Sequence, residues 1–448
     1  MAQLTTSEPV PAHRRPAELL QQLIRFDTTN PPGRERECIA YLETLLSEAG
    51  CETATRARDP ERPNLIARLP GRGDVPPLLL YGHVDVVTTD NQQWTHPPFE
   101  GKLVDGYVWG RGAIDMKSGV AMMLAAVLRA RAEGLIPAGD VLFCALADEE
   151  GFGGYGARFL VEQHQELFDG VEYALGEFGG FSLEIGSRRF YPIQVAEKQL
   201  CSVRATVRGP GGHGATPVRG GAMAHLAKTL TALDRKRLPV HITPVVREMC
   251  QTIANATPFP TSLAARRLVN PALTDSVLRL MGEGGRTFST LVRNTVSPTI
   301  LHASEKVNVI PSEASVVMDG RLLPGFAPED MLSELRAILD PDVHLEVVKY
   351  EPGPSEPRMG LFETLGGVLR ELDPEGVPIP LLMAGVTDAR FFSRLGIQTY
   401  GFLPMSLPPD FDFWSTVHAA DERIPAAAVE FGAEAMYRAL ERFGAPNA

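Results

Sequence analysis

Apolar positions along the first part of the chain follow two patterns of spacing. Between residues 19 and 46 they fall three or four apart, which predicts two helices, the second ending at Gly50. Short apolar runs typical of buried strands follow at 64–69, 78–84, 141–147 and 172–175. A helix rich in small residues is predicted over 118–132. Strands and helices in this order predict an α/β fold whose mostly parallel sheet is covered by helices.

The pattern changes near Tyr191. Apolar and polar residues alternate over 201–207, as expected of a strand with one solvated face. The elements predicted after it are a helix at 222–233, a strand at 315–322, a helix at 328–339 and a strand at 343–350. They indicate a smaller sheet-and-helix unit, and the long segment 239–298, irregular or helical, is not placed by the pattern.

Beyond Leu361 the first pattern resumes. The predicted elements are a helix from Leu361, a strand at 379–383, a helix at 389–395, a strand at 398–403 and a last helix from Pro425. We therefore predict a large domain formed by residues 1–192 and 355–448, with a smaller α+β domain, 193–354, inserted between its two parts. Residues 351–357, rich in proline and glutamate, are expected to be the exit hinge.

Composition narrows the class of protein. The 448 residues carry a formal net charge of −12 with an isoelectric point near 5.4, which argues against nucleic acid and anionic membranes as partners. Five cysteines without a C-x-x-C pair are expected to be reduced, mostly buried thiols. Arg14 and Arg15 are followed by no apolar stretch of a signal peptide, and no run approaches a membrane span. A cytoplasmic enzyme acting on small molecules or peptides is the expectation.

A histidine and an aspartate end the apolar run at 78–84. Ligands gather beyond the carboxyl ends of parallel strands, and His83 and Asp85 stand there, two residues apart. Residues two apart on an extended segment point the same way, so Asp85 can accept the imidazole N–H and hold the other nitrogen toward a cation. The alternative is a histidine satisfied by ordinary contacts beside a strand-end aspartate.

Further acids and a histidine follow other predicted strands. Asp115 lies in a glycine-rich loop at the start of a helix, where it could also be an N-cap. Glu149 and Glu150 end a buried strand in a run of three acids, which repel one another unless cations or protons neutralise them or water solvates the loop. Glu177 follows the next strand, and His418 precedes the last helix. Together, two histidines and three carboxylates match the nitrogen and oxygen ligands of a dinuclear zinc hydrolase, with a further acid as general base.

These motifs resemble those of the M20 family of metallopeptidases and amidohydrolases, from about Leu19 to the C-terminus. The resemblance implies the following roles: His83 and Glu177 bind one zinc ion, Glu150 and His418 bind the other, Asp115 bridges both, Glu149 is the general base, and Asp85 contacts only His83. It also implies a cis peptide between Asp115 and Met116. Cobalt or manganese would suit the same nitrogen and oxygen ligands.

The inserted domain resembles the family's lid or dimerisation domain, so a homodimer formed through it is expected. His213 resembles the loop histidine that reaches the neighbouring subunit's site and stabilises an oxyanion, and Asn308 and Arg321 resemble substrate-binding residues. Gly385 and Arg390 resemble the family's substrate-pocket segment. A structural hydrogen bond for His213, an ion pair within the lid for Arg321, and structural roles for Gly385 and Arg390 are the alternatives. Phe178 and the length of 239–298 depart from the family pattern and bear on substrate choice.

The expected activity is hydrolysis of an amide bond in an N-acyl amino acid or a short peptide with a free carboxylate. Metal-activated water would attack the carbonyl with Glu149 as base. Two alternatives stay open. One is an aminopeptidase or dipeptidase with the same two metals, and the other is a metal-binding relative without catalysis.

Overall fold

The computed structural model describes residues 10–353 and 356–445, which form two compact units. The first unit contains the chain up to Val195, Arg358–Pro380 and the chain from Thr387; the second contains Ala196–Pro357 and Leu381–Val386. The predicted boundary after residue 192 lies just before the first division. The predicted boundary between 354 and 355 lies outside the described residues, as does part of the expected hinge at 351–357.

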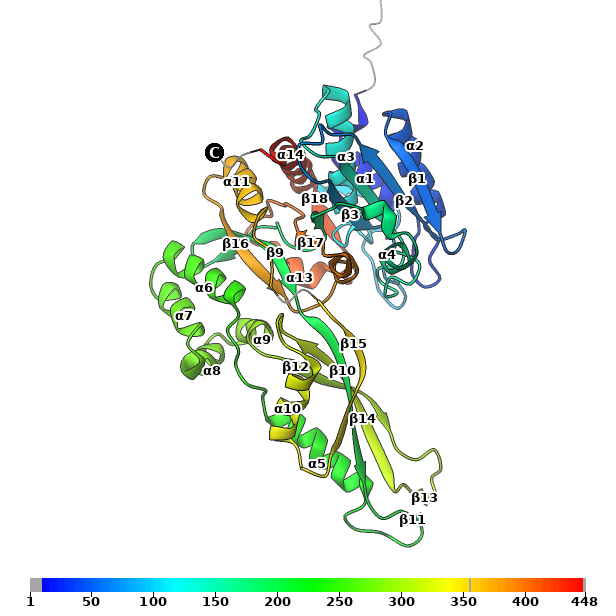
Figure 1. The fold of residues 1–448 in the computed structure, drawn as a ribbon, viewed down its shortest axis with the longest axis vertical. Coiled ribbons are helices and arrows are strands. Elements are labelled where there is room, and N and C mark those ends of the chain that lie inside the picture. Colours follow the sequence, from blue (N-terminus) through cyan, green and yellow to red (C-terminus); the bar gives the residue numbers. More distant parts are fainter. Residues whose placement is uncertain (1–9, 354–355, 446–448) are drawn as a thin grey trace, which may run out of the picture. The chain divides into compact units, whose positions relative to one another are not determined.

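The first unit is built on one large sheet (Figure 1). Its strands are β1 (Glu52–Ala57), β2 (Pro63–Leu69), β3 (Leu78–His83), β6 (Val141–Leu146), β7 (Tyr173–Gly176), β8 (Leu183–Ile185), β9 (Arg188–Glu197), β16 (Val377–Met383) and β17 (Gln398–Gly401). A small separate sheet contains β4 (Lys102–Val104), β5 (Tyr107–Trp109) and β18 (Arg423–Pro425). The helices are η1 (Ala12–Arg14), α1 (Pro16–Ile24), α2 (Arg36–Glu48), α3 (Lys117–Glu133), α4 (Ala157–Gln163), η2 (Gln165–Phe168), α11 (Phe362–Leu372), α12 (Ala389–Phe392), η4 (Ser393–Leu395), α13 (Phe413–Thr416) and α14 (Ala426–Arg442).

The strand order of the large sheet is β1-β2-β6-β3-β7-β17-β9-β16, with β8 paired to β9. The central strands β6, β3, β7 and β17 are parallel, which confirms the expected α/β fold with a mainly parallel sheet. The flanking pairs β1–β2, β2–β6 and β17–β9 are antiparallel. The edge strand β1 and the long strand β9 are absent from the sequence prediction, because β1 has no buried residue and the buried part of β9 contains proline and glutamine among its apolar residues.

Strand β3 is buried on both faces because helices cover both sides of it. Tyr81 belongs to an apolar cluster with α4 and α12 on one face. On the other face α3 approaches so closely that a Cβ on Gly82 would lie 2.7 Å from Met116 Cε and 3.0 Å from Val120 Cγ2. A side chain at Gly82 would displace the end of the Met116 side chain and press on Val120, so glycine allows this close approach, and the residue after it is His83.

The second unit is a four-stranded antiparallel sheet within the described residues, in the order β12-β14-β10-β15. Its elements are β10 (Gln199–Arg208), β11 (Gly212–His213), α5 (Ala222–Arg235), α6 (Pro244–Ala256), α7 (Thr261–Leu268), α8 (Pro271–Leu280), α9 (Glu283–Ser289), η3 (Thr290–Val292), β12 (Thr295–His302), β13 (Val309–Ile310), β14 (Glu313–Leu322), α10 (Pro328–Ile338) and β15 (His344–Glu351). Helices α5 and α10 bury the apolar side of the sheet, where Leu226, Val316 and Leu335 belong to one cluster.

The segment 239–298 is mostly helical. It contains α6 to α9, and β12 begins near its end. The N-caps of α6 and α8 are made by Thr243, whose side chain accepts from Val246 N, and by Asn270, whose side chain accepts from Ala272 N. Each cap is followed by proline at the first helical position, a strong local start signal.

All five cysteines are buried and none forms a disulfide, as expected from the sequence. Among the described residues, no helix combines the length and the apolar character that crossing a membrane requires.

Candidate metal centre

Three parallel strands bring the candidate ligands to one edge of the sheet. His83, the last residue of β3, is opposite Leu146, the last residue of β6, so the acids after β6 follow directly. Leu80 of β3 pairs with Leu175 of β7, which places Glu177 just beyond the same edge. The register of the central strands therefore gathers side chains that are distant in sequence.

His83 is buried and sits among carboxylates. Its Nε2 lies 3.1 Å from Asp115 Oδ1 and 3.4 Å from Glu177 Oε2. Its Nδ1 lies 2.9 Å from the backbone oxygen of Asp85 and 3.6 Å from the carboxylate Oδ1 of the same residue. A hydrogen bond from Nδ1–H to that backbone oxygen leaves Nε2 as the coordinating nitrogen.

The expectation that Asp85 contacts only His83 is wrong. The fully buried Asp85 carboxylate accepts hydrogen bonds from Asn30 Nδ2 at 2.9 Å, from Glu149 N at 3.0 Å and from Glu150 N at 3.1 Å. A carboxylate has room for several donors, and the backbone of the acidic loop supplies two of them. Asp85 therefore fixes the backbone that carries Glu149 and Glu150 as well as lying beside His83.

Asn30 connects two buried acids and is absent from the sequence-based site. Its Nδ2 also donates to Asp148 Oδ1 at 3.0 Å, and Arg62 forms an ion pair with the same oxygen at 2.9 Å. Asn30 lies far from the other site residues in sequence, and the local signal around it is a proline-rich turn. That pattern carries no sign of a contact with Asp85.

The Asp115 carboxylate lies between two histidines. Its Oδ1 faces His83 Nε2 at 3.1 Å and its Oδ2 faces His418 Nε2 at 3.0 Å. His418 Nε2 also lies 3.1 Å from Glu150 Oε1. The expected cis peptide between Asp115 and Met116 is present. One carboxylate with an oxygen toward each histidine is the arrangement a bridging ligand requires.

A second buried acid, Glu422, holds the loop that carries Asp115. Its Oε1 accepts from Ile114 N at 2.7 Å and from Asp115 N at 3.2 Å. Its Oε2 accepts from Gly112 N at 3.1 Å and from Arg111 Nη1 at 2.6 Å. The pairing of β18 with β5 places Glu422 there. Arg111 also donates to the backbone oxygens of Ala419 and His418, at 3.1 and 3.3 Å, so one buried pair positions both Asp115 and His418.

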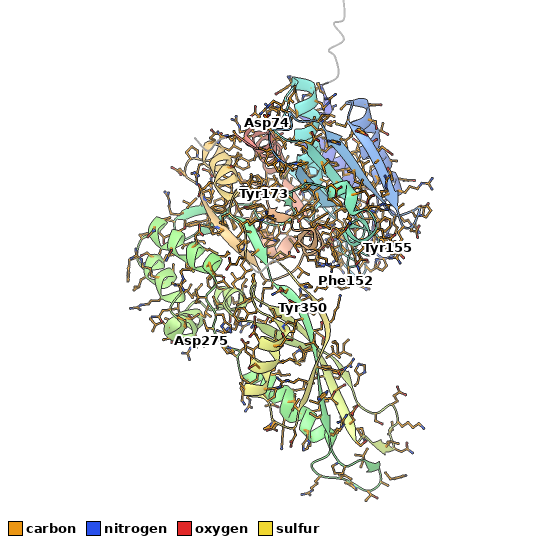
Figure 2. All side chains as sticks on the ribbon, in the orientation of Figure 1. Asp74, Phe152, Tyr155, Tyr173, Asp275 and Tyr350 are labelled. Carbon is orange, nitrogen blue, oxygen red and sulfur yellow. The ribbon has the colours of Figure 1, made fainter. Side chains whose placement is uncertain are left out.

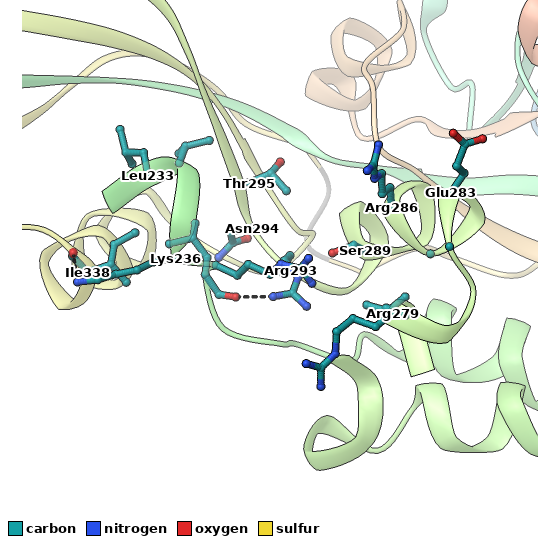
Figure 3. Close-up of a pocket in the computed structure, with 16 residues that line it drawn as sticks. Leu233, Lys236, Arg279, Glu283, Arg286, Ser289, Arg293, Asn294, Thr295 and Ile338 are labelled. Atoms are coloured by element: carbon teal, nitrogen blue, oxygen red, sulfur yellow. Dashed lines mark hydrogen bonds between the residues drawn. The ribbon is translucent and has the colours of Figure 1, made fainter. Parts of the chain in front are cut away.

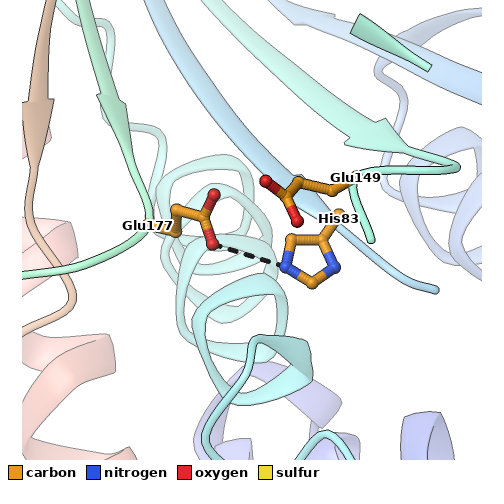
Figure 4. A group of neighbouring side chains, drawn as sticks. All are labelled: His83, Glu149 and Glu177. Atoms are coloured by element: carbon orange, nitrogen blue, oxygen red, sulfur yellow. Dashed lines mark ion pairs between the residues drawn. The ribbon is translucent and has the colours of Figure 1, made fainter. Parts of the chain in front are cut away.

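Ligand atoms fall within 4.8 Å of one another in two groups, His83 with Glu149 and Glu177, and His83 with Asp115 and Glu150. Figure 4 shows the first group, with Glu177 and Glu149 converging on the imidazole from separate strands. Nitrogen and carboxylate oxygen donors at this spacing suit Zn²⁺ and similar divalent cations.

The electrostatics of the cluster are dominated by its carboxylates. Burial raises the pKa of Glu149 well above its usual value, and the Glu177 carboxylate raises it further. Hydrogen bonds to Asp115 and Glu150 raise the pKa of His418 to about 10. Burial works against protonation of His83, but hydrogen bonds with Asp115, Asp85 and Glu177 outweigh it and raise the pKa. Protons on histidine and glutamate therefore neutralise charge that a cation would otherwise neutralise.

An aromatic cluster adjoins the site in sequence and in space. Phe178 follows Glu177, and its ring lies 5.5 Å from that of Trp414, four positions before His418. Phe181 stacks on Phe413 at 4.1 Å, and Phe413 meets Trp414 edge-on at 5.4 Å. Trp414 nevertheless stays 60% exposed, so one aromatic side chain of this cluster presents apolar surface to solvent.

The remaining candidates lie apart from this cluster in sequence. In the second unit, His213 is exposed at the end of β11, where it pairs with Val309 of β13, and the next residue, Gly214, donates through N to Asn308 O at 2.8 Å. Arg321 forms an ion pair with both carboxylate oxygens of Asp319, at 2.8 and 3.0 Å. This is the ion pair within the inserted domain that was the alternative to substrate binding. Gly385 is half-buried in the 381–386 segment.

Arg390 lies in the first unit. It is buried and donates through Nη1 to Thr387 O at 3.1 Å. Two residues before it stands Asp388, whose pKa is raised to about 7 by burial, and neither of its oxygens has a hydrogen-bond partner among the described residues. Asp388 is absent from the sequence-based site, because Thr387-Asp388 is also the pattern of an ordinary helix start. Substrate binding by Asn308, Arg321, Gly385 and Arg390 stays a prediction.

A mainly parallel α/β sheet with two histidines and several carboxylates at its strand ends defines the class of a metal-dependent hydrolase. The chain belongs to peptidase family M20/M25/M40, whose family model matches residues 79–442, and the resemblance inferred from its motifs is confirmed. It is 29% identical over 366 residues to an N-fatty-acyl-amino acid synthase/hydrolase of Homo sapiens, covering 79% of this chain and 71% of that protein.

Two further comparisons cover nearly the whole chain. A succinyl-diaminopimelate desuccinylase of Paracoccus denitrificans is 29% identical over 447 residues, covering 96% of this chain and 98% of that one. The M20 family metallo-carboxypeptidase Sso-CP2 of Sulfolobus solfataricus has the same fold, with a TM-score of 0.66 at 16% identity over 95% of this chain and 98% of that one.

Proposed function

We propose that this protein hydrolyses the amide bond of an N-acyl amino acid, or of a short peptide with a free carboxylate, at a centre holding two zinc ions. The observation that carries the proposal is the Asp115 carboxylate, with one oxygen facing His83 and the other facing His418. In the proposed centre His83 and Glu177 would hold one ion, Glu150 and His418 would hold the other, and Asp115 would serve both. When bound, the ions supply a Lewis acid and a water molecule of lowered pKa.

Glu149 is the proposed general base. Burial and the neighbouring Glu177 raise its pKa, which increases the affinity of this carboxylate for the proton that it would accept. Its backbone N–H is held by Asp85 at 3.0 Å, which limits the positions its side chain can reach. Glu149 would accept the proton of the attacking water and deliver it to the leaving amine.

His213 is the proposed donor to the oxyanion of the tetrahedral intermediate, reaching the site of a second copy of the chain. Its Nδ1 accepts from Ala215 N at 3.1 Å, so the proton of the neutral ring is on Nε2, the atom available to donate. This role requires the homodimer proposed through the second unit. A cytoplasmic location is part of the same proposal.

The aromatic cluster favours an apolar group in the substrate. Phe178 directly follows Glu177 and its ring contacts the exposed Trp414, and burying such ring surface under an acyl chain contributes about 25 cal/mol per Å². The name of the human relative specifies a fatty-acyl amino acid, which fits the same preference. We therefore propose Arg321 and Arg390 for the substrate carboxylate and the Phe178–Trp414 surface for the acyl group.

The test of the mechanism replaces Glu149 by Gln in the zinc-loaded protein. Turnover of an N-acyl amino acid should fall by about 10²-fold or more, while metal content stays near that of the unmodified protein. Glu48→Gln, on the exposed end of α2, is the matched control and should leave turnover unchanged. Undiminished turnover in Glu149→Gln would refute the mechanism, and no turnover in the unmodified protein would favour a metal-binding protein without catalysis.

The test of the substrate class compares N-blocked and free dipeptides with a series of N-acyl amino acids. Preference for blocked substrates with longer acyl chains is expected. Preference for a free amino terminus would instead support an aminopeptidase or dipeptidase. Trp414→Ala should lower kcat/KM for long acyl chains and leave that for acetyl substrates nearly unchanged.

A further inference from the structure

A cavity of about 540 Å³ lies within the second unit, apart from any residue of the candidate metal centre. It is lined by the end of α5, by α8 and α9, and by the start of β12 (Figure 3). Most of its wall therefore belongs to the segment 239–298, which includes the start of β12. The proposed hydrolysis gives this segment no role.

The cavity wall is strongly cationic. Its basic lining residues are Lys236, Arg237, Arg279, Arg286 and Arg293. Glu283 is the acid among the described lining residues, and the nearby Asp275 of α8 (Figure 2) lies 2.6 Å from Arg293 Nη2 and 3.6 Å from Arg237 Nη1. Five cations against two acids stand out in a chain whose net charge is −12. Concave clusters of one sign concentrate ligands of the opposite sign.

Arg293 gives the cavity a rigid anchor. The residue is 4% exposed, and its guanidinium donates to Leu238 O at 2.9 Å and to Asp275 Oδ1 at 2.6 Å. These bonds fix the plane of the group, while Nε has no hydrogen-bond partner among the described residues. Nε itself is covered by protein atoms, so the charge of the fixed guanidinium, rather than this donor, acts on a ligand in the cavity.

The rim cations are free to adapt. Arg279 and Arg286 are exposed, and they approach the cavity from different helices, α8 and α9. Figure 3 shows the two side chains on separate sides of Arg293. Arg279, Arg286 and Arg293 come from α8, α9 and the segment before β12, so a ligand with more than one acidic group can pair with several of them. Guanidinium groups pair with carboxylate, phosphate and sulfonate alike.

The wall between the cations is apolar. Leu233, Leu278 and Ile338 line the cavity together with the basic residues. The volume is in the range of sites for organic ligands and well above what an inorganic anion fills. Charge and volume together define the class of ligand.

We propose that this cavity binds a small organic anion consisting of an apolar body and two or more acidic groups, held by Arg293 and by the rim residues Arg279 and Arg286. This binding site is independent of the proposed hydrolysis, since it shares no residue with it.

The probe for the test is naphthalene-1,5-disulfonate, because sulfonates coordinate zinc weakly and so do not compete for the metal centre. Titration calorimetry on the full-length, zinc-loaded protein should show saturable binding at one site per chain. Naphthalene-1-sulfonate and inorganic sulfate should both bind at least several-fold more weakly. Binding should weaken as salt is added, because the contacts are exposed ion pairs.

The variant pair keeps the test specific. Arg279→Gln with Arg286→Gln should weaken disulfonate binding about tenfold, since each exposed charge contact accounts for about threefold. Arg266→Gln with Arg267→Gln, on exposed positions of α7 outside the cavity, changes the net charge equally and should leave binding within about twofold. Absence of saturable binding, equal loss in both variants, or equal affinity for sulfate would overturn the proposal. Because the readout is binding, its outcome is separate from that of the hydrolysis assays.

Discussion

Removing the carboxylate of Glu422 should damage the metal centre without touching a ligand. Glu422→Ala deletes the acceptor of three backbone N–H groups in the loop that carries Asp115 and leaves the guanidinium of Arg111 without its partner. Both side chains of the pair are almost completely buried, at 1% and 0% exposure. Water therefore cannot replace the lost contacts unless the loop opens.

The size of the effect follows from this burial. Breaking a buried ion pair by removing one partner typically costs about 3–5 kcal/mol, because the other charge remains buried and uncompensated. Burial raises the pKa of Glu422 despite the opposing effect of Arg111, so the carboxylate is itself incompletely compensated. We therefore expect the lower end, about 3 kcal/mol of unfolding free energy. Metal affinity should also fall, by about 10- to 100-fold, as is typical when the supports of metal ligands are removed.

The chain provides a selective assay and an internal control. Its three tryptophans, Trp94, Trp109 and Trp414, all lie in the first unit, so tryptophan fluorescence in a urea titration reports on that unit alone. Glu434→Gln removes an acid whose pair with Arg129 is about one-third exposed, and it should cost at most about 1 kcal/mol. Metal affinity is measured by competition with a chromophoric chelator.

Equal destabilisation by Glu422→Ala and Glu434→Gln would refute the reasoning, because it would mean that the loop does not depend on the buried carboxylate. A loss of stability with unchanged metal affinity would refute the expectation that metal binding depends on Glu422. In that case the loop would keep Asp115 in place without Glu422.

Three further outcomes are expected. Asn30→Ala should lower the unfolding free energy of the first unit by about 1–3 kcal/mol, since Asp85 and Asp148 both lose a buried donor, and an unchanged urea midpoint would contradict this. Removing bound metal with a chelator should lower the thermal midpoint reported by tryptophan fluorescence, and zinc should restore it in the unmodified protein but much less in Asp115→Asn. Burial lowers the pKa of Lys198 to about 7 from 10.5, with help from Arg321 and Arg293, so between these values the unfolded chain holds the additional proton. The unfolding free energy of the unmodified protein relative to Lys198→Met should therefore rise with pH across that window and level off below pH 7; a pH-independent difference would contradict it.

The hydrophobic pattern of the sequence was sufficient to predict the helices and strands that are buried on both sides. The strands ending at His83 and Leu146 are continuous apolar runs, and the helix after Asp115 is rich in small residues, so their type and order follow from hydrophobicity alone. Strands at the edge of a sheet were harder to predict from the sequence. Strand β12 is exposed along most of its length, and no apolar pattern marks it.

The candidate ligands could be found because each stands at a strand or loop end with a polar group next to an apolar run. The residues that hold these ligands in place could not be found in this way. Asn30 and Glu422 act through contacts that span 55 and about 310 positions of sequence, and each is surrounded by ordinary loop residues. The single-partner role expected of Asp85 failed for the same reason, because spacing along one strand says nothing about which loop will fold against it.

The sequence separation of Arg111 and Glu422 also determines when the two residues can first meet during synthesis of the chain. The two residues are 311 positions apart, so at typical elongation rates about 15–60 s pass between their emergence from the ribosome. During that interval the loop of Asp115 has no carboxylate to hold it, and His418 does not yet exist. The nascent chain thus carries an acidic edge that can acquire neither its shape nor its full set of ligands until the final helix is about to be made.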